Sequence, residues 1–133
     1  MQIKKQTFIK LSLVIILIPI GLLTKVYSGS GSEFVTNYLG GVIYVIFFIV
    51  LASLGFPKAE PIKISLIVLC ITCIIEFSQL IHTPTLELFR KNYFFRALFG
   101  STFNPFDFIW YLVGALSGLF LVGFVIKFPA RSK

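Results

Sequence analysis

The hydrophobic positions of the chain gather in four long apolar runs separated by short polar segments. These runs predict helices over residues of about 8–25, 38–56, 62–82 and 106–126. A helix that crosses a bilayer needs roughly 20 mainly apolar residues, because the hydrocarbon core is about 30 Å thick and each residue adds about 1.5 Å. The pattern therefore predicts an all-α fold, an integral membrane four-helix bundle that forms a single polytopic domain over residues 1–133.

The first apolar run is short for a membrane span. It extends from Leu11 to about Leu23 and has lysines on both sides. Long side chains such as those of Lys10 and Lys25 can reach the interface and lengthen the usable helix, so we expect this helix to be retained. A basic start before a short apolar stretch also fits a cleaved signal peptide, and that alternative stays open.

Two of the polar connections have distinct characters. Residues 57–63 contain two prolines and predict a tight turn between the second and third helices. The segment of about 84–105 is too charged to span a bilayer and too aromatic to be surrounded by water. We expect this segment to lie in the membrane interface between the third and fourth helices.

Composition supports the membrane assignment. Hydrophobic residues make up 57% of the chain and charged residues 13%, which leaves too little polar surface for a soluble globule of 133 residues. The net charge of +7 would suggest nucleic-acid binding in a soluble domain. In a membrane protein it is better explained by flanking charges that orient helices and meet anionic lipids, so we expect membrane lipids and no nucleic acid as partners.

The distribution of lysine and arginine predicts the orientation. Positive charges favour the cytoplasmic side, and with four spans most of them fall on one side. They are Lys4, Lys5, Lys10, Lys58, Lys63, Lys127, Arg131 and Lys133. This predicts a multi-pass protein of the cell membrane with cytoplasmic N- and C-termini. The segment of about 84–105 would then face outward, although it carries Arg90, Lys91 and Arg96. Cations on the unexpected side suggest that they are needed there.

Glu76 is the first candidate for chemistry, because it lies inside the apolar run from Ile64 to Ile81. An ionisable side chain near the bilayer centre costs roughly 2.5–3.5 kcal/mol even on the mildest scale. It must therefore be paired, protonated or exposed to a wet cavity. Gln79 follows three positions later and shares the same helix face.

One face of the fourth helix is polar at its start and small beyond it. Its members are Asp107, Tyr111, Gly114 and Gly118. We expect this face to pack on the third helix, so that its polar start approaches Glu76 and Gln79, with Arg90 or Arg96 folding back as the counter-charge. The glycine spacing also permits a homodimer contact. The candidate ligand-binding cluster comprises Glu76, Gln79, Arg90, Arg96, Asp107 and Tyr111.

The cysteines suggest neither a disulfide nor a metal site. Cys70 and Cys73 fall within one turn of the third helix, where a disulfide is geometrically poor. A metal would need further ligands that the sequence does not offer, so we expect no metal and no cofactor. We interpret both cysteines as small residues at a helix interface.

Three motifs occur together in the second half of the chain. They are Glu-x-x-Gln from Glu76, a basic segment ending in Leu98-Phe-Gly-Ser-Thr-Phe103, and Asp-x-x-x-Tyr-x-x-Gly from Asp107. This combination resembles the VanZ-like superfamily, and more closely a branch labelled as a domain of unknown function, over roughly residues 34–120. The resemblance implies a polytopic bacterial membrane protein with a polar cluster of Glu76, Gln79, Arg96 and Asp107.

The chain departs from this resemblance at three positions. The branch pattern has Arg and Asp near the start of the second span, where this chain has Thr36 and Gly41. A possible ion pair is therefore lost as a unit. The superfamily also tends to Asn at the position of Tyr111.

Three functional hypotheses follow. The first is a binding or accessory protein of the cell envelope, whose outward polar cluster recognises an anionic lipid or glycan head group. The second is a structural subunit of a larger membrane complex. The third is a membrane-embedded enzyme in which Glu76 acts as acid or base and His82 assists.

Overall fold

The computed structural model describes residues 2–99 and 103–126. Its elements follow in the order α1 (Gln2–Val26), α2 (Ser32–Phe34), η1 (Val35–Leu39), α3 (Gly40–Gly55), α4 (Pro61–Ser78), α5 (Pro84–Arg90), α6 (Tyr93–Phe99), α7 (Asp107–Phe120) and η2 (Leu121–Ile126), where η denotes a π-helical stretch. The described residues contain helices and no strand, which confirms the all-α prediction.

Three helical stretches are long and apolar enough to cross a membrane. They are Lys5–Val26, Ser32–Gly55 and Pro61–Ser78, and the middle one joins α2, η1 and α3 end to end. These stretches identify a membrane protein by length and composition. α7 is shorter, with 14 residues, and η2 continues its helical path to Ile126. The fourth span therefore stays a prediction.

Two helix boundaries differ from the prediction. The second helical stretch begins at Ser32 instead of residue 38, because Gly31 takes the turn in the left-handed region (φ 72°) and residues 33–37 hold no proline or glycine. α4 ends at Ser78 instead of residue 82. The next three N–H groups, from Gln79 on, bond to carbonyls three residues back, and such bonds tighten the end of a helix.

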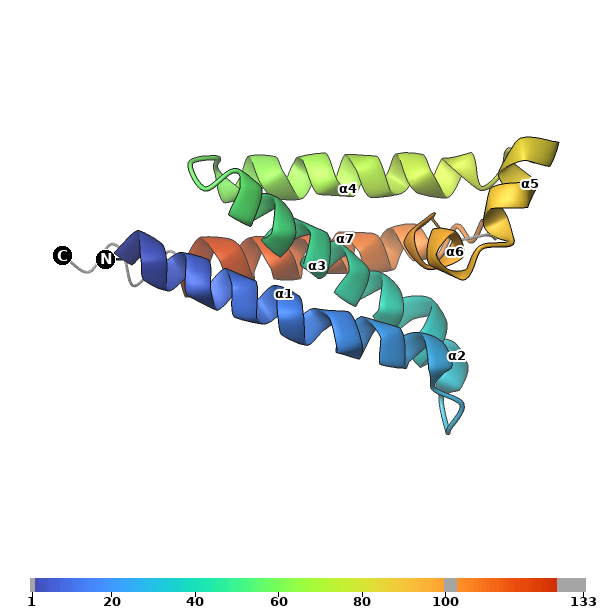
Figure 1. Cartoon of the computed structure of the whole chain (residues 1–133), viewed down its shortest axis with the longest axis horizontal. Coiled ribbons are helices and arrows are strands. Elements are labelled where there is room, and N and C mark those ends of the chain that lie inside the picture. Colours follow the sequence, from blue (N-terminus) through green and yellow to red (C-terminus); the bar gives the residue numbers. More distant parts are fainter. Residues whose placement is uncertain (1, 100–102, 127–133) are drawn as a thin grey trace.

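α3 is the central helix of the bundle. It runs obliquely between α1 and α4 and packs most extensively against α7 and α1 (Figure 1). Its residues Val45, Ile49 and Val50 are fully buried. Around them lie buried apolar side chains of the other long helices, Val14, Ile64, Val68, Ala115 and Val122. The core therefore sits on α3, with α1 on one side and α4 and α7 on the other.

The polar start of the predicted face reaches α4 through Tyr111 and Glu76, but its glycines pack on α3, so the prediction that they meet the third helix, α4, was wrong. A Cβ atom at Gly114 would lie 2.9 Å from the carbonyl oxygen of Val42, and one at Gly118 would lie 2.7 Å from Cδ1 of Ile49. α7 lies against both α3 and α4. The two helices come closest at the glycines, because a residue without a side chain lets the α3 backbone approach. Since α3 covers these glycines, they are not free for a homodimer contact.

The predicted interfacial segment contains two short helices, α5 and α6. Thr83 begins α5 by accepting a hydrogen bond from the Leu86 N–H at 3.2 Å, and Pro84 occupies the first turn. Asn92 begins α6 by accepting bonds from the N–H groups of Phe94 and Phe95. Together α5 and α6 cover one end of the bundle, which we call the cap end (Figure 1).

At the opposite end of the bundle, Lys10 connects α1 to α3. Its side chain is buried, and Nζ donates a 3.2 Å hydrogen bond to the carbonyl oxygen of Ser53 near the end of α3. Cations are favourable near the C-terminus of a helix because its last carbonyls carry partial negative charge. Lys10 therefore ties α1 to α3.

Candidate functional site

The Glu76 carboxylate joins three parts of the chain in the last turn of α4. Its side chain is only 1% exposed. Oε1 accepts a 3.0 Å hydrogen bond from the backbone N–H of Asn104, and Oε2 accepts a 2.8 Å bond from the Tyr111 hydroxyl. Gln79 Nε2 adds a longer contact of 3.4 Å to Oε2. Both carboxylate oxygens are therefore occupied by donors.

Gln79 links the end of α4 to the end of α6. Its Nε2 donates a 2.7 Å hydrogen bond to the carbonyl oxygen of Phe99, while its Oε1 is buried without a partner among the described residues. The i, i+3 spacing places this amide beside Glu76, as the sequence predicted. The amide thus holds the last residue of α6 against the end of α4.

Asp107 begins α7 directly beside Glu76. A turn at Asn104-Pro105 sets this start, since the Asn104 carbonyl accepts a bond from the Asp107 N–H at 3.0 Å. The Asp107 carboxyl interacts with that of Glu76, and Lys25 is the positive charge that acts on it. Its Oδ1 is buried and unpaired in the described structure. We refer to Glu76, Gln79, Asp107 and Tyr111 as the carboxylate cluster.

Arg90 does not serve as counter-charge to the carboxylate cluster, so that prediction was wrong. Its guanidinium is buried and donates to the carbonyl oxygens of Ile81 (2.9 Å) and Ser78 (3.2 Å) and to Oε1 of Glu87 (2.7 Å). The last carbonyls of a helix need donors, and α4 ends in this region. Arg90 therefore fastens α5 to the C-terminal end of α4.

Glu87 completes this arrangement on the exposed side of α5. His82 Nδ1 lies 2.9 Å from the same oxygen that Arg90 contacts. Hydrogen bonds from His82 and Arg90 hold the pKa of Glu87 below its ordinary value of 4.5. Neither Glu87 nor this partnership was predicted, although the Glu87-x-x-Arg90 spacing was a signal for it.

The remaining predicted cation, Arg96, lies on α6 and has an exposed side chain. Lys91 directly follows α5 and is exposed as well. Within the described residues Arg96 has no ion pair. The structure thus brings together four of the six predicted site residues, Glu76, Gln79, Asp107 and Tyr111, and leaves the two arginines outside them.

A cavity of about 220 Å³ lies beside Arg90 at the cap end. It is lined by Ser78, Leu86, Arg90, Phe95 and Phe99. Phe99 is the residue whose carbonyl accepts the bond from Gln79, so the carboxylate cluster fixes one wall of this cavity. The sequence offered no signal for the cavity, because its walls come from three elements.

The described part of the chain contains no group of three or more His, Cys, Asp or Glu residues that could hold a metal ion. Cys70 is exposed on α4 and Cys73 is half-buried, and both are free thiols.

The comparisons with known proteins place the chain in a family. A family described as "Protein of unknown function (DUF2809)" matches residues 30–115, a stretch that includes the carboxylate cluster, α5 and α6. No curated protein and no solved structure matches the chain. The match agrees with the predicted branch of unknown function, while nothing found ties the chain to the VanZ-like superfamily. The chain belongs to the DUF2809 family.

Proposed function

We propose that the protein is a binding protein of the cell envelope that recognises the anionic head group of a lipid or glycan at its cap end. In this proposal the cap end faces outward and both termini are cytoplasmic. The lysine distribution supports that orientation. Phe34 in α2, Tyr38 in η1 and Trp110 in α7 pack against one another, and because Trp and Tyr favour the membrane interface, these rings support an interfacial position for this end of the bundle.

The observation that carries the proposal is the buried Arg90 beside the cap cavity. A guanidinium has five N–H groups, and three of them donate to Ile81, Ser78 and Glu87. Two therefore have no protein acceptor in the described structure. A phosphate or carboxylate in the cavity of about 220 Å³ would accept from them, because Arg suits planar, bidentate recognition of such groups. Lys91 and Arg96 add positive charge on the same cap.

The carboxylate cluster has a supporting role in this proposal. Glu76 is enclosed, and its oxygens already accept from Asn104, Gln79 and Tyr111. A general acid or base needs to come within hydrogen-bond reach of its substrate. The arrangement therefore favours binding over acid–base catalysis, with the cluster holding Phe99 and Asn104 in position.

The test measures binding of phosphatidylglycerol and of glycerol phosphate to the detergent-purified protein by native mass spectrometry. Leu86→Trp fills the cavity without removing a charge, and we expect it to abolish glycerol phosphate binding and to reduce the number of bound phosphatidylglycerol molecules by one. Leu88→Trp on the same helix is the matched control, because Leu88 is 68% exposed and does not line the cavity. Equal binding by the two variants would contradict the proposal.

A second pair of variants tests the charge. Arg90→Lys keeps a positive charge but loses the planar fork of donors, so binding should fall about tenfold if one charge-assisted bond is lost. Lys63→Gln, at the other end of α4, should leave binding unchanged. Circular dichroism checks that each variant keeps its helical content, since Arg90 also holds α5 on α4.

A further inference from the structure

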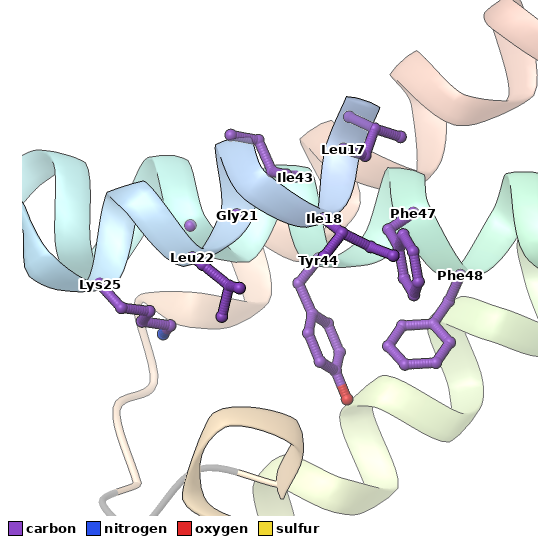
Figure 2. A pocket seen from close by; sticks show the side chains of 10 residues that line it. Leu17, Ile18, Gly21, Leu22, Lys25, Ile43, Tyr44, Phe47 and Phe48 are labelled. Atoms are coloured by element: carbon purple, nitrogen blue, oxygen red, sulfur yellow. The ribbon is translucent and has the colours of Figure 1, made fainter. Parts of the chain in front are cut away.

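A second cavity, of about 190 Å³, lies between α1 and α3 and shares no lining residue with the cavity beside Arg90 (Figure 2). Its walls are mainly apolar, and the polar side chains among them are those of Lys25 at one end and of Tyr44. The lining residues include Leu17, Ile18, Leu22, Phe47 and Phe48. Gly21 on α1 and Gly40 on α3 also line it. We call this cavity the α1/α3 groove.

Lys25 is the charged residue of the groove. Figure 2 shows it at one end, beyond Leu22, while Phe47 and Phe48 lie at the other end. Its side chain is exposed and forms no ion pair among the described residues. The groove therefore has one cationic end and an apolar body, which is the polarity of an anionic lipid.

The length of the groove matches one leaflet of a bilayer. From Leu17 to Lys25 the helix advances eight residues, or roughly 12 Å at 1.5 Å per residue. Half of a hydrocarbon core about 30 Å thick is roughly 15 Å. A chain that starts at Lys25 would therefore run through most of its own leaflet and end near Phe47 and Phe48.

The volume of the groove suits one hydrocarbon chain better than a helix. One turn of a helix about 10 Å wide, with a pitch near 5.4 Å, fills roughly 400 Å³. An apolar cavity of about 150 Å³ is enough to bind benzene. The groove, at about 190 Å³, lies near the second value. A second copy of the chain would not insert a helix here.

We propose that the α1/α3 groove binds one acyl chain of an anionic lipid and that Lys25 pairs with the phosphate of its head group. The charge at the groove mouth selects the head group, and the apolar lining formed by Leu17, Ile18, Leu22 and Phe47 receives the chain. This site is separate from the Arg90 cavity and does not depend on the function proposed for the cap.

The electrostatics around Lys25 are consistent with this assignment. Lys25 Nζ lies 3.8 Å from the position of a Cβ atom on Gly40, so the ammonium group sits over the α3 backbone at the groove mouth. The opposite charge that it acts on is Asp107 at the start of α7. Lys25 forms no ion pair with Asp107 or another carboxylate among the described residues, so a lipid phosphate can supply one.

The test titrates the delipidated, detergent-purified chain with three probes followed by native mass spectrometry. Lysophosphatidylglycerol has one chain and an anionic head, lysophosphatidylcholine has one chain and a zwitterionic head, and glycerol phosphate has no chain. We expect lysophosphatidylglycerol to fill one site that glycerol phosphate does not fill. A basic residue near an anionic group contributes about 1 kcal/mol, so Lys25→Gln should weaken lysophosphatidylglycerol binding about fivefold.

Two matched controls separate the groove from the general lipid surface. Leu22→Trp narrows the groove and should abolish the single site, whereas Leu23→Trp should not, since Leu23 is 63% exposed and outside the lining. Lys5→Gln, at the opposite end of α1, should leave the affinity unchanged. Leu86→Trp closes the cap cavity alone, so it should leave intact the lysophosphatidylglycerol site that glycerol phosphate does not fill.

Photo-crosslinking keeps the inference testable should Leu22→Trp fail to fold. A lysophosphatidylglycerol with a diazirine in its chain, bound to the unaltered protein, should label peptides from residues 17–25 and 43–48. Several equivalent lipids per chain, with equal affinity for both head groups and with labels spread over α4 and α7, would show annular lipid only and overturn the proposal. A dimer that forms through α1 and α3 and excludes lipid would overturn it as well.

Discussion

The Tyr111 hydroxyl donates a 2.8 Å hydrogen bond to Oε2 of Glu76, and the two residues are 35 positions apart in the chain. The bond crosses from the first turns of α7 to the last turn of α4. Glu76 is 1% exposed, so this bond replaces water that the carboxylate has lost. A relationship of this kind fixes the register of the two helices.

Tyr111→Phe should lower the free energy of unfolding by about 1.5–3 kcal/mol, the usual contribution of a hydrogen bond to a charged group. The phenylalanine ring fills the same space, so packing is retained. Unfolding by sodium dodecyl sulfate, followed by circular dichroism, measures the change. Tyr93→Phe is the control, because Tyr93 is 49% exposed on α6 and should cost almost nothing. A Tyr111→Phe protein as stable as the unaltered one would refute the role of this bond.

Glu76→Ala should be strongly coupled to Tyr111→Phe. Removing the carboxylate leaves the Tyr111 hydroxyl and the Asn104 N–H without their acceptor, so the second substitution then has less to remove. Residues in one hydrogen-bond network show coupling energies of about 0.5–3 kcal/mol. The double mutant should therefore be more stable than the sum of the single effects implies. Combining Glu76→Ala with Tyr93→Phe should give additive effects, and additivity in both pairs would contradict the network.

Gly114→Ala should destabilise the bundle by about 1–3 kcal/mol, the usual cost of overpacking. The new Cβ atom would lie 2.9 Å from both the Val42 carbonyl oxygen and Cβ of Val45, so α7 and α3 would have to separate. Gly55→Ala is the matched control. A Cβ atom there meets nothing within 4 Å, so this variant should be neutral or slightly stabilising. Thermal unfolding in detergent compares the two variants.

Stability of the cap should fall in acid. Hydrogen bonds from His82 and Arg90 lower the pKa of Glu87 from 4.5, so its ionised form is stabilised by the fold. A group whose folded pKa is lowered contributes stability that is present above its unfolded pKa and is lost as pH falls through the folded value. We expect the cap contacts to weaken below pH 4.5. Limited proteolysis between α4 and α6 at several pH values measures this.

Glu87→Gln provides the control for the acid effect. It removes the titrating carboxyl while keeping a side chain of similar size, so cleavage in the cap should lose its dependence on pH in this range. A Glu87→Gln protein with the same acid response as the unaltered chain would assign the effect to another group.

Much of the carboxylate cluster could be predicted from the spacing of its residues along the sequence. The i, i+3 spacing of Glu76 and Gln79 and the i, i+4 spacing of Asp107 and Tyr111 each define one helix face. The cost of a carboxylate in an apolar helix then requires the two polar faces to meet. This argument predicted the contact between Tyr111 and Glu76 that the structure contains.

The partners of Arg90 could not be predicted from the spacing of residues. Its spacing from Glu87 made a local ion pair available, and the unpaired carbonyls at the end of α4 offered it further acceptors. A flexible, five-donor side chain takes whichever acceptors the packing brings near. The sequence contains several candidates within reach, so the choice among them depends on how α5 turns back on α4.

The sequence by itself determined the helical and membrane character of the protein, because the length and composition of apolar runs depend only on neighbouring residues. It also determined which side chains share a helix face. Tertiary structure alone decided that the glycines of α7 face α3, that Arg90 holds the end of α4, and that a groove opens between α1 and α3. Periodicity fixes the faces of a helix, but which faces meet depends on the packing of all the helices at once.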